Sequence, residues 1–205
     1  MNNKLKALLE DITKKKKDGY DFEMKEIDTI AEAVRDSIME HNTIEPTPIV
    51  KISETFDIPV FQTQYISKEH SGDIHIHDEK CDKVKEEKII LVDKNETLEQ
   101  QRFVIAHELA HYLFDYIGSD YQINNKPYTC PYLKNNHEGE AEKRANRFAA
   151  SLLMPKHIFI QAHNNAVDID DRRIYVIKYL SRLFQVKEAS IIKRIKEVTE
   201  RIETY

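Results

Sequence analysis

The sequence predicts an α+β protein in which a helical N-terminal arm and a helical C-terminal segment flank a small antiparallel sheet and two long helices. Three observations support this fold class: alternating polar and apolar residues in short segments before residue 93, an apolar-rich helical stretch after Thr97, and apolar residues at helical spacing towards the C-terminal end. Its 205 residues, 40% of them hydrophobic, suffice for the core of one main domain with small appendages. With 33% charged residues and no apolar run approaching roughly 18 residues, the sequence predicts no membrane span.

Residues 1–45 are predicted to form the N-terminal arm. Apolar residues recur there at spacings of three and four, as on one face of an amphipathic helix: Ile27, Ile30, Val34 and Ile38. This helix is expected to end near His41 and Asn42, because Pro46 and Pro48 then interrupt the pattern. The arm is expected to pack on the main body.

Residues 46–156 are predicted to form the main domain, which begins with a short helix and a sheet. Strand signals occur in three segments: 58–66, 72–78 and 88–92. The middle segment, GDIHIHD, alternates with period two, and the last is a short apolar run typical of a buried strand. A small antiparallel sheet of about three strands is the simplest arrangement of these segments.

Two long helices are predicted after the sheet. Thr97 and Gln100 resemble a capping box, and the helix that they begin is expected to continue to a glycine stop at Gly118. A loop with two prolines follows, and the second helix, over 138–154, ends before Pro155. The sheet is expected to pack on the first of these helices.

Residues 157–205 are predicted to form a basic helical segment. Its last two helices are joined by a short connection at Gln185, Val186 and Lys187, so the pair has the form of a helix-turn-helix. Residues 172–205 carry nine Lys and Arg against four Asp and Glu, a net charge of +5. Such a surface suits nucleic acid, but a solvated helix surface is the commoner cause, so direct DNA binding is a secondary interpretation.

A His-Glu-x-x-His motif lies inside the first long helix, at His107, Glu108 and His111. A spacing of four places the two imidazoles one turn apart on one face, where their nitrogens can hold one metal ion. Glu108 projects beside that site and can accept a proton from a metal-bound water. The surrounding residues are apolar, and metal binding offsets the cost of burying polar groups among them. The motif predicts a zinc-hydrolase centre with two histidine ligands and Glu108 as general base.

The third ligand is expected from the second long helix, because a catalytic zinc site needs three protein ligands and one open position. Glu142 is favoured, since it shares a helix face with Asn146, four residues further on. Glu138 and, after it, His137 are the alternatives. The side-chain oxygen of Asn146 is expected to accept a hydrogen bond from His107 and fix its orientation.

The two motifs HELAH and EKRANRFAASLLMP together resemble the ImmA/IrrE metallo-endopeptidase family, whose hallmark is HExxH followed after about 30 residues by a helix of the form ExxANxFAxxLLMP. The resemblance covers roughly residues 48–155 and includes the segments IVKISETFDIPVFQ and KIILVDKN. One departure is Arg144, which stands directly before the alanine of the second motif where many members have an acidic residue.

This resemblance implies that Glu142 is the third zinc ligand and that Glu108 is the general base. It further implies a zinc-dependent endopeptidase whose protein substrate is a helix-turn-helix transcriptional repressor, so that cleavage relieves repression in a mobile element or a stress response. A cytoplasmic location is expected separately, because two cysteines fit a reducing compartment and the first residues lack the apolar stretch of a secretory signal.

Several other side chains are weaker candidates for function. His70, His75 and His77 lie near a predicted strand, and His75 and His77, which face the same side, could form a second metal site, although polar surface is the commoner explanation. Cys130 could reach the zinc as a redox-sensitive thiolate, although a plain free cysteine is commoner. Four residues are candidates for stabilising an oxyanion, and the choice among them stays open: Tyr128, Tyr132, His157 and His163.

The alternative function is a DNA-binding or repressor-docking regulator with a non-catalytic metal site. Two features count against it. Glu108 has no task in a structural zinc site, and the sequence suggests no fourth ligand to close one.

Overall fold

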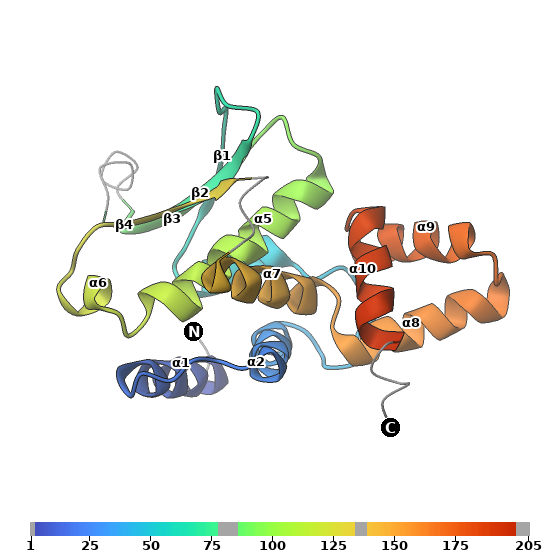
Figure 1. Cartoon of the computed structure of the whole chain (residues 1–205), viewed down its shortest axis with the longest axis horizontal. Coiled ribbons are helices and arrows are strands. Elements are labelled where there is room, and N and C mark those ends of the chain that lie inside the picture. Colours follow the sequence, from blue (N-terminus) through green and yellow to red (C-terminus); the bar gives the residue numbers. More distant parts are fainter. Residues whose placement is uncertain (1–2, 78–85, 134–138, 200–205) are drawn as a thin grey trace.

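The computed structural model describes residues 3–77, 86–133 and 139–199 of the chain. They form a mixed α+β fold, which confirms the predicted fold class (Figure 1). Among these residues, no helix is both long and apolar enough to cross a membrane. The buried apolar side chains form one connected core that extends from Leu5 near one end to Val198 near the other.

The sheet contains four strands, one more than predicted: β1 (Val60–Thr63), β2 (His70–Ile76), β3 (Lys88–Asp93) and β4 (Tyr128–Leu133). Their order is β1-β3-β2-β4, and β2 pairs antiparallel with both of its neighbours. The pair β1 and β3 is parallel, so the expectation of a wholly antiparallel sheet is wrong at this edge. After β1, the chain forms β2 two positions away in the sheet. It then turns back, and β3 fills the position between β1 and β2.

Strand β4 lies where the sequence suggested a loop. Pro131 has no backbone N–H and argued against a strand, but β4 is at the edge of the sheet, where a missing donor is tolerated. The strand pairs along its length with β2, from Tyr128 opposite Ile76 to Leu133 opposite His70. A chain segment directly before the second long helix is thereby brought beside the first.

The motif helix, α5 (Leu98–His111), begins as predicted, because the side chain of Thr97 accepts a hydrogen bond from the backbone N–H of Gln100. It continues into one π-helical segment, η1 (Tyr112–Tyr116). Gly118 follows with φ +72°, and a side chain there would lie 3.2 Å from the backbone oxygen of Thr13, so a glycine ends this helix as expected.

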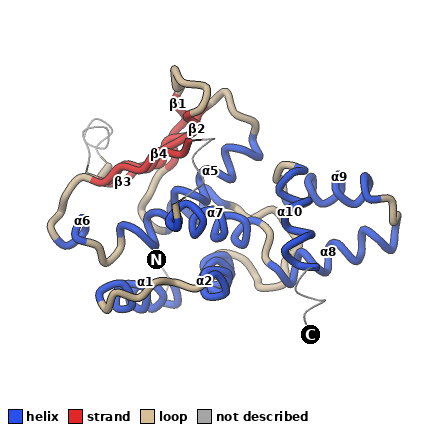
Figure 2. Tube along the Cα trace, in the orientation of Figure 1, coloured by secondary structure: helices blue, strands red, loops and turns tan. Residues whose placement is uncertain are grey.

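Helix α5 is covered on both sides, as Figures 1 and 2 show. The sheet lies on one side and α7 (Glu140–Leu153) on the other, and α2 (Met24–Asp36) packs against α7. Gly72 of β2 allows the sheet to approach closely, since an added Cβ would lie 2.3 Å from the side chain of Val104. A helix enclosed in this way can carry buried polar residues into a dry environment.

The remaining helices complete the two ends of the molecule: α1 (Asn3–Lys17), α3 (Ile49–Thr55), α6 (Asp120–Ile123), α8 (Lys156–Ile169), α9 (Arg173–Phe184) and α10 (Glu188–Thr199). Helices α8, α9 and α10 form a group at one side of α7 (Figure 1). Helix α10 is fixed to the end of α7, because the buried guanidinium of Arg194 donates to the backbone oxygen of Met154 at 2.9 and 3.1 Å. Helix α2 ends at Asp36, earlier than expected.

Candidate metal centre

Three potential ligand atoms converge between α5 and α7. His107 and His111 are one turn apart on α5, and their side chains are 1% and 2% exposed. Glu142, in the first turn of α7, directs one carboxylate oxygen to each Nε2 at 3.3 Å. The two Nε2 atoms lie 3.0 Å from each other. Within the described ranges this is the one grouping of three such residues close enough to share an ion, its atoms lying within 4.8 Å.

The spacing of these atoms fits a zinc ion. Zinc binds histidine nitrogen and carboxylate oxygen at about 2.0–2.2 Å, so two ligands of a tetrahedral site are separated by roughly 3.3 Å. Two imidazole Nε2 atoms at 3.0 Å repel when both carry a lone pair, so either a proton or a cation must lie between them. A cation between them and the carboxylate of Glu142 meets this need.

Each imidazole is held in its orientation by a contact at Nδ1, the ring nitrogen that faces away from the candidate metal position. The Nδ1 atom of His107 lies 3.1 Å from Oδ1 of Asn146, and the Nδ1 atom of His111 lies 2.6 Å from Oδ2 of Asp115. When Nδ1–H donates to these oxygens, the lone pair is left on Nε2, which is the tautomer that a metal requires. Asp115 was missed from the sequence, although its position four residues after His111 places it on the same helix face.

Arg144 takes part in this arrangement through Asp115. Its guanidinium donates to Oδ1 of Asp115 at 3.0 Å and to Asp21 of the segment before α2 at 2.9 Å. Burial raises the pKa of Asp115, but hydrogen bonds from His111 and Arg144 outweigh this and keep the pKa below its usual range. The basic residue that departs from the family pattern thus helps to keep Asp115 ionised.

The protonation states of His107 and Glu142 are set by burial and by the contacts between their side chains. Burial lowers the pKa of His107 and so favours its neutral form. Burial raises the pKa of Glu142, but the close contacts of its carboxylate with the Nε2 atoms of His107 and His111 reverse this and bring its pKa to about 2. An ionised Glu142 beside a neutral imidazole is the charge state that binds a divalent cation.

Glu108 occupies a different position. Its side chain is fully buried, and neither carboxylate oxygen accepts a hydrogen bond of normal geometry in the described part of the chain, although the backbone N–H of Ile74 is close enough to lower its pKa. Burial raises its pKa to about 8; His111 acts against this rise, and the nearby charge of Asp73 adds to it. A carboxyl group in these surroundings is poised to exchange a proton near neutral pH.

The histidines near β2 do not form a second centre within the described residues. His75 is buried rather than at the surface, and it lies 2.7 Å from Asp73. His70 is 3.2 Å from the same carboxylate, while His77 follows the strand with φ +49°. These contacts give His70 and His75 a place in a buried hydrogen-bond group beside Glu108.

Of the other candidate residues, some lie beside the metal-ligand histidines and others lie away from them. The ring of Tyr132 packs edge-on against His107, with 4.8 Å between centroids. Cys130 lies next to His111, and burial raises the pKa of its thiol above the usual value. His157 stacks instead on His41, at the junction of α8 with the end of the arm. Two residues weighed as third ligands, Glu138 and His137, lie outside the described residues.

A helix that presents a buried His-Glu-x-x-His motif to a glutamate on a second helix defines a metallopeptidase-like domain. The profile of the peptidase M78 family, described as the IrrE N-terminal-like domain, matches residues 53–196. The chain therefore belongs to this family, which confirms the resemblance seen in the sequence.

Among solved structures, a chain described as a Mycobacterium tuberculosis transcriptional regulator is similar, with a TM-score of 0.55 and 21% identity. The match covers 92% of this chain and 52% of that one, so this chain spans about half the length of the regulator. A likeness at this identity shows the fold alone. Comparison with curated proteins gave no match.

Proposed function

We propose that this chain is a zinc-dependent endopeptidase that hydrolyses a peptide bond in a protein substrate. One observation carries the proposal: three ligand atoms converge on one point between two helices, and an unpartnered buried carboxyl group, Glu108, lies on the same helix. A purely structural metal site has no use for that carboxyl group, whose burial without a partner costs free energy. Membership of the M78 family supports the same reaction class.

The side chains take distinct roles in this proposal. His107, His111 and Glu142 hold the zinc ion, which when bound supplies the Lewis acidity that activates water and polarises a carbonyl. Glu108 takes a proton from the attacking water on a carboxylate oxygen and returns it to the amine that leaves. Asn146 and Asp115 act as positioning residues, since each holds the Nδ1 atom of one histidine.

For the substrate we propose a helix-turn-helix transcriptional repressor, whose cleavage relieves repression in a mobile element or a stress response. The support is the membership of the ImmA/IrrE family and the description of a structural neighbour as a transcriptional regulator. A soluble protein substrate in the cytoplasm is consistent with this proposal.

Co-expression with helix-turn-helix repressors from the same source tests this function. Wild type should cleave one of them, and Glu108→Gln should lower the cleavage rate about 10²- to 10⁴-fold, the usual contribution of a general base. Glu140→Gln is the matched control, because Glu140 is exposed on α7 and pairs only with Lys143 in the described residues. If Glu108→Gln cleaves as fast as wild type with its metal bound, the proposal fails.

The second candidate, a DNA-binding regulator, has one supporting observation, the basic helix pair α9 and α10. Part of its charge is unavailable to phosphate, however, because Arg194 is 2% exposed and bonded to Met154 and Glu197. A gel shift at stated salt concentrations separates the candidates, since sequence-specific nanomolar binding by the full chain supports a regulator.

A further inference from the structure

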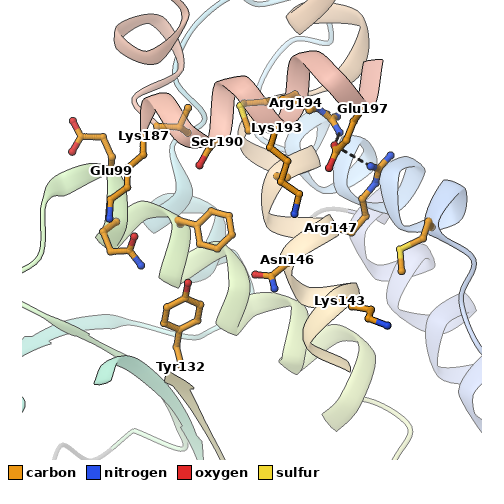
Figure 3. A pocket seen from close by; sticks show the side chains of 16 residues that line it. Glu99, Tyr132, Lys143, Asn146, Arg147, Lys187, Ser190, Lys193, Arg194 and Glu197 are labelled. Carbon is orange, nitrogen blue, oxygen red and sulfur yellow. Dashed lines mark hydrogen bonds and ion pairs between the residues drawn. The ribbon is translucent and has the colours of Figure 1, made fainter. Parts of the chain in front are cut away.

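A pocket of about 560 Å³ lies beside the candidate metal centre and has no part in the roles assigned so far. We call it the α10 pocket, because α10 forms one wall; the others come from α5, α7, β4 and the start of α2 (Figure 3). Asn146 and Tyr132 line it, and both also contact the ring of His107. The α10 pocket therefore begins one side chain away from the metal ligands.

The floor of the α10 pocket is apolar. It is built from Phe103 of α5, from Ala150 and Met154 at the end of α7, and from Val186 before α10. A pocket of this volume has room for a few side chains of a peptide, and an apolar floor with a few polar groups at the rim is typical of binding sites.

Most charges at the rim of the α10 pocket are already neutralised. Lys143 pairs with Glu140 at 2.6 Å, and Arg147 and Arg194 both bind Glu197 at 3.1 Å. Lys187 and Lys193 are different, because neither side-chain amine has an ion-pair or hydrogen-bond partner within the described residues. Figure 3 shows both side chains extending from the α10 side towards the space between the helices.

Two amines without acidic partners beside an apolar floor favour an occupant that carries carboxylates and apolar groups together. Glu99 is the one acidic rim residue besides Glu197, and it forms no ion pair with Lys187 in the described structure. The excess charge of the rim is therefore positive.

We propose that the α10 pocket binds an acidic segment of the protein substrate beside the bond that is cleaved, and that Lys187 and Lys193 hold its carboxylates. This inference rests on the proposed peptidase function and adds a substrate preference to it. The C-terminal helices then serve substrate selection, since Lys193 lies on α10 and Lys187 directly precedes it.

The test uses a tryptic peptide library of total cell protein in two arms. In the first, the zinc-supplied wild-type chain cleaves the library, and mass spectrometry records which residues flank each cleaved bond. In the second, the Glu108→Gln chain is immobilised and the peptides that it retains are sequenced. Both arms are repeated with Lys187→Glu/Lys193→Glu, which should retain acidic peptides about 10-fold less, as expected for two lost exposed ion pairs.

Lys178→Glu/Arg182→Glu is the matched control. It makes the same change in charge on exposed positions of α9, outside the α10 pocket, and should behave as the unmodified chain. Thermal unfolding of both double variants checks that they are folded.

The proposal predicts Asp and Glu enriched near the cleaved bonds and among retained peptides, with the enrichment lost only in Lys187→Glu/Lys193→Glu. Cleavage without acidic preference, or a preference that survives this charge reversal, overturns the role of the α10 pocket and leaves the peptidase intact. If wild type cleaves no peptide of the library, the retention arm alone decides whether the α10 pocket binds acidic peptides, and the co-expression test with intact repressors decides the peptidase function.

Discussion

Helix α7 has two largely buried polar regions, and they differ in how completely their groups are partnered. On the side towards α5, Glu142 meets two imidazoles that face each other, and Glu108 nearby has no hydrogen-bond partner in the described residues. On the side towards α2 and α10, Asp28 accepts hydrogen bonds from Arg147 and Ser151, and Arg147 also binds Glu197.

This difference in partnering distinguishes a region that binds a ligand from a region that only holds the fold together. A buried polar group costs free energy unless it finds partners, so a region with its partners in place can join elements of the fold. A region in which a polar group lacks a partner is completed by an ion or a substrate. We therefore assign the side facing α5 to function, and the network around Arg147 to holding α2, α7 and α10 together.

Arg147→Ala gives the largest expected change in stability. It leaves Asp28 without its cationic partner, while Glu197 keeps Arg194. We expect the free energy of unfolding to fall by about 2–3 kcal/mol, less than for a fully buried pair because the groups retain some exposure. Zinc content should not change. Chemical denaturation measures the effect, and Lys143→Ala, which removes an exposed pair on the same helix, should cost at most about 0.5 kcal/mol.

Asp115→Asn weakens the other region without removing a ligand. Loss of the carboxylate behind His111 should reduce zinc affinity about 10- to 100-fold, the usual effect of changing a residue that orients a metal ligand. Competition with a zinc chelator measures the affinity. An unchanged affinity would show that Asp115 serves only its contact with Arg144.

Lowering the pH should also weaken the network around Arg147, but it should lower the free energy of unfolding by less than Arg147→Ala does. Burial raises the pKa of Asp28, but the hydrogen bonds from Arg147 and Ser151 prevail, so its folded pKa lies below the unfolded value of about 3.9. Its contribution to stability is therefore complete above that value and is lost as the pH falls through the folded pKa. Urea denaturation between pH 6 and pH 3 should show a smaller acid loss for Arg147→Ala than for wild type.

The functional region was the more predictable of the two. His107, Glu108 and His111 follow from one helical motif, and the cap at Thr97 and the stop at Gly118 are local signals that the structure confirms. Asp115 lies in the predicted helix four residues after His111, but an acidic residue at that spacing does not by itself distinguish a partner of His111 from a solvated side chain.

The structural region depends on contacts that no local pattern reveals. Asp28 and Arg147 are 119 residues apart in the chain, and periodicity says only that each lies on a helix. Strand β4 was missed for a similar reason, since Pro131 argues against a strand until its place at the sheet edge is known.

The central claim is tested most directly by the zinc content of purified wild type, Glu142→Ala, Glu138→Ala and Arg147→Ala after supply of zinc. We predict about one zinc ion per chain in wild type, Glu138→Ala and Arg147→Ala, and loss of the metal in Glu142→Ala. A wild-type chain that takes up no zinc, or a Glu142→Ala chain that keeps it, would contradict the assignment of the region between α5 and α7 as the metal centre.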